Sequence, residues 1–280
     1  MIGHLPARAQ TDRGNAAGKR ERLSHAANKS PMVRPFARAL ALLATFTPND
    51  HWLANGDLAA RSELPPSTVT RLAKWLAQLG YLHRSPVDRK YRLSASVLAL
   101  GYGAIANSAV QRSARAHMKT FADQHKVHVC LSTRDRLDLI ILSSYGSRQS
   151  FFKLNLHVGA RLGIASSPLG WALLAALPEL ERLYLMENIE RRKPREWLRI
   201  QRRLNQAMDE VNDKGFCSSL GEWDQDLGIV AVPLLIEGYA PLVLACVGPT
   251  SKMTRPRVDR ELGRRLLAMA AVIQREGASE

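Results

Sequence analysis

The segment LPPSTVTRLAKWLAQLGYL, residues 64–82, combines small hydroxyl side chains and cations with an apolar stripe. Hydroxyls near a helix N-terminus allow close approach to a phosphate backbone, where helix N–H groups also favour anions. Arginine and lysine on the same face reach phosphates or guanine edges. A solvated helix face would also be polar, but it should mix acids with bases, and residues 67–78 contain no acid. The segment therefore favours contact with nucleic acid, through Pro66, Ser67, Thr68, Thr70, Arg71 and Lys74.

The apolar residues of this segment follow helical spacing. Val69, Leu72, Ala73 and Leu76 fall at i, i+3, i+4 and i+7, which places them on one helix face. Proline at 66 is tolerated in a first helical turn, and Gly80 suits the C-terminal end. The pattern predicts a helix that begins near Pro66, with one face buried and the opposite face exposed.

Two further helices are predicted before this one. The first begins near Arg34 and ends at Pro48, with an apolar face made by Phe36, Ala39, Leu40 and Leu43. The second spans residues 55–62 and adds Leu58 and Ala59 to the same core. A tight turn through residues 63–64 then leads to the helix that begins near Pro66.

A short hairpin is predicted after the third helix. Extended segments at residues 81–84 and 90–93 flank the turn sequence Ser-Pro-Val-Asp. Arg84, Arg89 and Lys90 on this hairpin are either edge-strand charges that prevent aggregation or clamps on the flanking DNA backbone or minor groove. Three helices and a basic hairpin make a winged helix-turn-helix over residues 32–94.

The net charge is concentrated in this part of the chain. The 280 residues carry 40 Lys and Arg against 25 Asp and Glu, a net charge of +15, with a pI near 10.3. Residues 1–93 account for +9 and residues 94–280 for +6. A polyanion is therefore the first partner to consider, either nucleic acid or an anionic membrane surface. Residues 1–31 have the composition of a disordered basic arm, which either adds non-specific DNA affinity or is inert.

Insertion into a membrane is not expected. No apolar run approaches the ~20 residues needed to cross a bilayer, and the N-terminus lacks the apolar segment of a signal peptide. The sequence predicts a cytoplasmic protein without a membrane partner.

The remaining chain predicts a linker helix over residues 95–111 and an α+β domain over residues 112–276. Helices and strands alternate there, and long antiparallel strands with helices grouped beside them are typical of α+β domains. Helices are predicted at 112–125, 168–176, 179–187, 197–214 and 257–275, and strands at 127–132, 137–143, 151–156, 229–236 and 241–247. Residues 159–165 are interpreted as irregular and 191–193 as a solvated loop.

Catalytic and metal sites are not expected in this domain. Cys130, Cys217 and Cys246 are far apart and lack CxxC spacing, so they are interpreted as buried apolar thiols. Glu222, Asp224 and Asp226 are three carboxylates within five residues, a cluster of the kind that can bind a metal. A solvated acidic loop is the simpler interpretation. No cofactor is predicted.

Motifs along the chain resemble those of the IclR family of bacterial transcription regulators. The N-terminal matches are RAL at 38–40, DLAARSELPPSTVTRL at 57–72, LGYL at 79–82, YRL at 91–93 and LALG at 98–101. The C-terminal matches are VGARLGIASSPLGWALLAALP at 158–178, KGF at 214–216, Glu222, IVAVP at 229–233 and VGP at 247–249. The resemblance covers about residues 32–273, with the motifs in the same order.

The resemblance implies a winged helix-turn-helix, a linker helix used in dimerisation, and a GAF-like α+β domain with an effector pocket beside its sheet. It also implies homodimers or dimers of dimers on palindromic double-stranded operator DNA. Alignment with the family's pocket motifs suggests a lining of Ser219, Ile229, Ala245, Cys246 and Val247. Several of these positions are polar in the family and apolar here, which favours an effector with an apolar body, such as an aromatic acid.

Two serines add a further candidate contact in this domain. Ser166 and Ser167 precede the helix predicted at 168, where their hydroxyls either bind an effector carboxylate or simply cap the helix.

The chain departs from the family pattern at Glu63, where the turn often has glycine, at Gly163 and Ala165, where proline and histidine are common, and at Asp226, where glycine is expected.

The sequence therefore predicts a DNA-binding regulator controlled by a small-molecule effector, and not an enzyme. Two alternatives remain: a regulator whose second domain only oligomerises, and an enzyme that carries a winged helix as an accessory.

Overall fold

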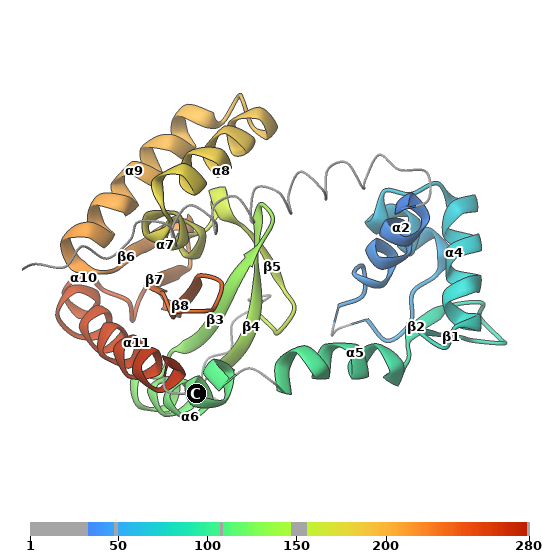
Figure 1. Cartoon of the computed structure of the whole chain (residues 1–280), viewed down its shortest axis with the longest axis horizontal. Coiled ribbons are helices and arrows are strands. Elements are labelled where there is room, and N and C mark those ends of the chain that lie inside the picture. The colour runs from blue at the N-terminus through green and yellow to red at the C-terminus, as the bar shows by residue number, and fades with distance from the viewer. Residues whose placement is uncertain (1–32, 48–49, 107–108, 147–155, 279–280) are drawn as a thin grey trace, which may run out of the picture. The chain divides into compact units, whose positions relative to one another are not determined.

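The computed structural model describes residues 33–47, 50–106, 109–146 and 156–278 (Figure 1). The chain divides into two compact units, one that ends at Gly103 and one that begins at Ala104. The arm predicted for residues 1–31 lies outside the described residues, as does all but the last residue of the strand predicted for residues 151–156.

Within the described residues, the first unit contains three helices, a two-stranded hairpin and most of a further helix. These are α2 (Val33–Leu43), α3 (Asn55–Ser62), α4 (Pro66–Gln78), β1 (Leu82–Arg84), β2 (Tyr91–Leu93) and α5 (Ala95–Ala106). The two strands pair antiparallel, with Leu82 opposite Leu93. Leu53 adds an isolated antiparallel bridge to Tyr91. This order confirms the predicted winged helix-turn-helix.

The core of this unit confirms the predicted stripe of α4 but not that of α2. Side chains of α4 at 69, 72, 73 and 76 are all buried. On α2, however, Phe36 and Leu40 are 73% and 65% exposed, and the buried residue is Leu42. The spacing i, i+3, i+4, i+7 also occurs at residues 39, 42, 43 and 46, and this second stripe faces the core. Periodicity alone did not distinguish the two stripes.

The turn between α3 and α4 keeps the left-handed backbone conformation of a helix-turn-helix. Glu63 has φ 54° and ψ 28°. A residue with a Cβ is disfavoured in this region by about 1 kcal/mol relative to glycine. Glutamate at this position therefore strains the turn.

The second unit is an α+β domain built on one antiparallel sheet. Its strands are β3 (His128–Asp135), β4 (Asp138–Gly146), β5 (Arg161–Gly163), β6 (Cys217–Asp224), β7 (Leu227–Leu234) and β8 (Leu242–Pro249). Their order in the sheet is β5-β4-β3-β8-β7-β6. Its helical segments are α6 (Ala109–His125), η1 (Ile164–Ser166), α7 (Pro168–Ala176), α8 (Glu179–Arg192), α9 (Trp197–Lys214), α10 (Arg255–Arg257), the π-helical turn η2 (Val258–Leu262) and α11 (Gly263–Ala278).

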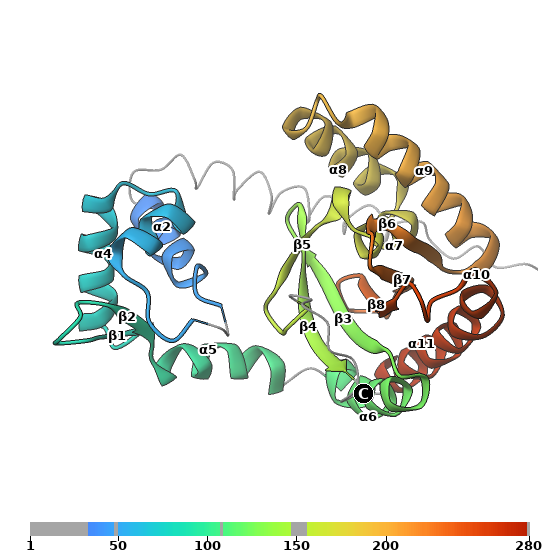
Figure 2. The same ribbon diagram turned by 180° about the vertical axis from the view of Figure 1, so that it is seen from behind.

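The helices cover both faces of this sheet. One core joins alternate strand residues to α7, α8 and α9, and the other joins the opposite strand residues to α6 and α11. In both views α6 and α11 lie together on one side of the sheet (Figures 1 and 2). None of the described helices combines the length and apolarity that crossing a bilayer requires.

Three local expectations in this unit were wrong, and the predicted last helix is present with an irregular start. Part of the stretch expected to be irregular forms the edge strand β5, and α8 continues through Arg192, so the expected solvated loop is helical until Lys193. The expected acidic loop is mostly strand, since Glu222 and Asp224 lie on β6. The last helix begins as α10 and passes through a π-helical turn.

Candidate nucleic-acid interface and ligand pocket

The outer face of α4 is exposed and cationic. Ser67, Thr70, Arg71 and Lys74 are exposed, and Thr68 is half-buried at the edge of the face. Pro66 begins the helix. The N-cap residue is Pro65, so no side chain caps the first N–H groups. Among the described residues, no carboxylate forms an ion pair with Arg71 or Lys74. This face therefore presents uncompensated positive charge and a free helix N-terminus, both of which suit phosphate.

Thr70 has a structural role that the sequence did not indicate. Its Oγ1 donates to the Pro66 carbonyl oxygen at 2.9 Å and accepts from Asn55 Nδ2 at 2.9 Å. Asn55 Nδ2 also approaches the Pro66 carbonyl at 3.3 Å. These bonds join the start of α3 to the first turn of α4, so Thr70 fixes the angle between the two helices.

Two arginine–tryptophan stacks lie in the described part of this unit, and neither was anticipated. The Arg71 guanidinium carbon lies 5.4 Å from the ring centroid of Trp75, one turn further along α4. The Arg92 guanidinium carbon, on β2, lies 4.9 Å from the ring centroid of Trp52. Both distances are in the range of cation–π attraction. The signal for the first was in the sequence, as an i, i+4 pair on a helix.

The predicted wing cations are exposed on the hairpin. Arg84 ends β1, and Arg89 and Lys90 precede β2. Arg89 has φ 54°, a left-handed conformation that closes the turn. Ser85 Oγ accepts from the Asp88 N–H at 3.1 Å and holds the turn from inside. The wing thus carries its charges at and beside a constrained tip.

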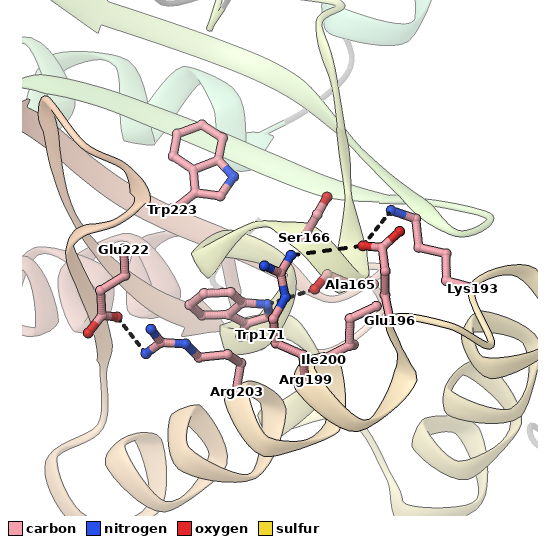
Figure 3. Close-up of a pocket in the computed structure, with 10 residues that line it drawn as sticks. All are labelled: Ala165, Ser166, Trp171, Lys193, Glu196, Arg199, Ile200, Arg203, Glu222 and Trp223. Atoms are coloured by element: carbon pink, nitrogen blue, oxygen red, sulfur yellow. Dashed lines mark hydrogen bonds and ion pairs between the residues drawn. The ribbon is translucent and has the colours of Figure 1, made fainter.

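A cavity of about 330 Å³ lies in the second unit beside α7, α9 and β6 (Figure 3). Its volume is at the small end of the range for ligand pockets. Its walls combine aromatic and charged side chains, namely Ala165, Ser166, Trp171, Lys193, Glu196, Arg199, Ile200, Arg203, Glu222 and Trp223. Sequence reasoning had named only Ser166 as a site residue among these, because they come from five separate segments of the chain.

The charges around this cavity are paired. Arg203 Nη1 lies 2.7 Å from Glu222 Oε2. On the other side Lys193 Nζ and Arg199 Nη2 lie 3.7 and 3.9 Å from Glu196 Oε2. Figure 3 shows these two groups on either side of the Trp171 ring. Three cations against two carboxylates leave a net positive lining that favours an anionic ligand.

The floor of the cavity depends on a close approach between η1 and α7. Trp171 Nε1 donates to the Ala165 carbonyl at 3.0 Å, which orients the indole. A Cβ at Gly170 would lie 2.1 Å from the Ile164 carbonyl oxygen, so only glycine fits there. Ser167 is buried and caps α7, with its Oγ accepting from the Gly170 N–H at 3.2 Å. Ser166 faces the cavity and Ser167 does not line it.

The apolar positions suggested by alignment are core residues that do not line this cavity. Ile229, Ala245 and Val247 are fully buried in the core beneath α7. The side chain of Cys246 lies on the opposite face of the sheet, in the core with α6 and α11, because alternate residues of a strand face opposite sides. Ser219 is buried, and its Oγ accepts from the Trp223 N–H at 3.1 Å, which secures the bulge of β6.

The three thiols are poorly suited to nucleophilic chemistry. Burial raises the pKa of Cys130 and of Cys246 to about 12. Burial, reinforced by the nearby Glu210 carboxylate, also raises the pKa of Cys217. A reactive cysteine needs the opposite shift. Within the described residues, no group of three or more potential metal ligands is brought together.

Comparison with known proteins identifies both units. Residues 36–86 match the IclR helix-turn-helix domain, and residues 102–275 match the bacterial transcriptional regulator IclR C-terminal domain. The chain belongs to the IclR family. Its first unit is the DNA-binding domain and its second is the C-terminal ligand-binding domain of an IclR-type transcriptional regulator, which confirms the resemblance seen in the sequence.

Individual relatives span nearly the whole chain. The crystal structure of an IclR family transcriptional regulator from Brucella abortus is 36% identical, with TM-score 0.73, and the match covers 85% of this chain and 90% of that one. The HTH-type transcriptional regulator TsaQ1/TsaQ2 of Comamonas testosteroni is 29% identical over 88% of each chain. An IclR homolog from Microbacterium hydrocarbonoxydans, crystallised with 4-hydroxybenzoate, shares the fold at 22% identity and TM-score 0.69, covering 88% of this chain and all of that one.

Proposed function

We propose that this IclR-type regulator binds palindromic operator DNA as a homodimer or a dimer of dimers. The helix α4 of each subunit enters a major groove through Pro66, Ser67, Thr68, Arg71 and Lys74, while Thr70 supports it from the flank. The wing residues Arg84, Arg89 and Lys90 contact the flanking backbone or minor groove. The observation that carries this proposal is the exposed face of α4, whose cations have no carboxylate partner among the described residues.

We assign residues 32–94 to DNA binding, residues 95–111 to a linker and residues 112–276 to effector binding and oligomerisation, with residues 1–31 as a basic arm. Operator binding places the working protein in the cytoplasm. This arrangement lets a ligand act on DNA affinity only as far as it binds the DNA-competent and incompetent states differently.

The effector that suits the cavity is a small organic anion with an aromatic body. Trp171 and Trp223 offer flat apolar surface, and the net positive lining favours a carboxylate. The bound 4-hydroxybenzoate of the Microbacterium homolog has this chemistry. Ser166 is the predicted serine that is positioned to contact such a ligand.

Operator binding is tested by footprinting the full-length protein on the DNA upstream of its own coding region. We expect a protected palindrome and an affinity that falls steeply with salt, since each neutralised phosphate releases a counterion. Protection without two-fold symmetry, or affinity independent of salt, contradicts the proposal.

Effector binding is tested by thermal shift with benzoate, 4-hydroxybenzoate and the neutral analogue benzyl alcohol. We expect stabilisation by the acids and not by the alcohol, and loss of that stabilisation in Arg203→Ala. If no acid stabilises the protein, the second unit serves as a ligand-free oligomerisation module. Catalysis is not proposed, because the raised thiol pKa values argue against a cysteine nucleophile; turnover of any panel compound would contradict this.

A further inference from the structure

Trp75 places a large indole at the edge of the cationic face of α4. This residue is 47% exposed, although tryptophan contributes most to stability when it is buried. The neighbours on this face are Arg71, one turn earlier, and Lys74. The ring therefore contributes little to the core of the first unit, and the Arg71 guanidinium carbon lies 5.4 Å from the ring centroid.

The stack restricts how the guanidinium of Arg71 can point. A free arginine side chain samples many rotamers and loses that freedom on binding. A guanidinium held against an aromatic face keeps its N–H donors at the edge available for a bidentate contact. No carboxylate among the described residues takes these donors. Guanine presents O6 and N7 as adjacent acceptors in the major groove, and an arginine fork matches them.

We propose that Trp75 is a positioning residue for base recognition, which holds Arg71 in the orientation that reads a guanine in each half-site. The inference rests on the proposed entry of α4 into the major groove. The pair of Arg92 and Trp52 supplies a matched control, because it has the same chemistry at 4.9 Å but lies on β2 and the segment before α3. Preorganisation of this kind gains affinity by reducing the entropy lost on binding.

The test is selection of preferred sites from a random duplex library by the full-length protein. Wild type should enrich one guanine position per half-site. Arg71→Lys, which keeps the charge but not the fork, should lower that guanine preference about tenfold. Trp75→Leu and Trp75→Ala should lower it about two- to fivefold at the same position, while Trp75→Phe retains most of it. The salt dependence of binding should be unchanged in all four variants, because none removes a charge.

Trp52→Ala should leave the base preference unaltered. The inference is overturned if Trp75→Leu keeps the wild-type preference, or if it alters a different position from Arg71→Lys, since Trp75 would then contact a base of its own. Retention of the guanine preference by Arg71→Lys overturns it equally. A wild-type protein that enriches no sequence contradicts operator recognition itself, which is a separate outcome. Thermal unfolding checks each variant, and Trp75→Leu, which keeps apolar volume, carries the test if Trp75→Ala unfolds.

Discussion

Arginine and tryptophan meet both on the outer face of α4 and around the cavity of the second unit, but the two settings differ in charge. On α4 the cations Arg71 and Lys74 have no carboxylate partner among the described residues. Around the cavity Arg203 pairs with Glu222, and Lys193 and Arg199 face a second carboxylate. Unpaired cations respond to any dense polyanion. A paired cation must give up its carboxylate partner before it can bind a ligand. Binding is therefore favourable only for a ligand that makes further contacts.

The largest expected effect comes from removing the unpaired cations. In Arg71→Ala/Lys74→Ala we expect affinity for operator DNA to fall about 100-fold at low salt, because two phosphate or base contacts are lost. The slope of log affinity against log salt should become shallower by about 1 to 2. Fluorescence anisotropy at several salt concentrations measures both quantities. Arg191→Ala/Arg192→Ala, on α8, removes the same charge and should have little effect; equal losses in the two double variants would mean that only net charge matters.

The second-largest expected effect is on stability, and it compares a glycine in a tightly packed site with a glycine that has open space around it. In Gly170→Ala the new Cβ would lie 2.1 Å from the Ile164 carbonyl oxygen, so η1 and α7 must separate. We expect a loss of about 1–3 kcal/mol in the free energy of unfolding, measured by denaturant titration, together with weaker stabilisation by benzoate. In Gly56→Ala, on α3, the Cβ meets nothing within 4 Å, so stability should be unchanged or slightly higher. Similar losses in both variants would show that the close approach at Gly170 does not hold the cavity.

The same contrast explains what the sequence revealed. The surface of α4 is local: one helix carries both the buried stripe and the cations, so spacing within 13 residues predicted it. The cavity is non-local, and Lys193, Arg203 and Trp223 meet only because α9 and β6 pack beside α7. No spacing along the chain encodes that meeting.

Irregular backbone accounts for other misses. The bulge in β6, with Gly221 at φ 82°, interrupts strand alternation, so the segment resembled a loop. On β8 the alternation of a regular strand is enough to put Cys246 on the opposite face from Ala245 and Val247, and this alternation can be predicted from the sequence. On α2 two overlapping stripes satisfied the same spacing, and only packing chose between them.

A smaller effect follows from releasing one paired cation. In Glu222→Gln the Arg203 guanidinium loses its carboxylate partner at 2.7 Å and becomes available to a ligand. We expect benzoate affinity, measured by isothermal titration calorimetry, to rise about two- to fivefold, in line with the modest free energy of a partly exposed ion pair. Glu187→Gln breaks the Arg191 pair on α8, neither residue of which lines the cavity, and should leave benzoate affinity unchanged. Weaker benzoate binding in Glu222→Gln would mean that the Glu222 side chain, and not Arg203, contacts the ligand.

The smallest expected effect concerns Asp50, a carboxylate with a structural role in the DNA-binding unit. Asp50 accepts hydrogen bonds from Arg61 and from the backbone and hydroxyl of Thr47. The hydrogen bond from Arg61 above all, opposed in part by burial, holds the pKa of the Asp50 carboxyl well below its ordinary value of 3.8. The stabilisation is therefore fully present above about pH 5 and is lost as the pH falls through the lowered pKa.

Asp50→Asn should lower the melting temperature by about 2 °C between pH 5 and 8, since solvent screens this partly exposed pair. Below about pH 4 the difference from wild type should shrink, because the carboxyl of the unfolded wild-type chain then takes up a proton, which favours unfolding. Asp88→Asn, on the wing, removes the same charge where the structure describes no ion pair and should show no such pH-dependent difference. A deficit in Asp50→Asn that persists unchanged at pH 3 would mean that the ring of hydrogen bonds around residue 50, and not its charge, stabilises the segment between α2 and α3.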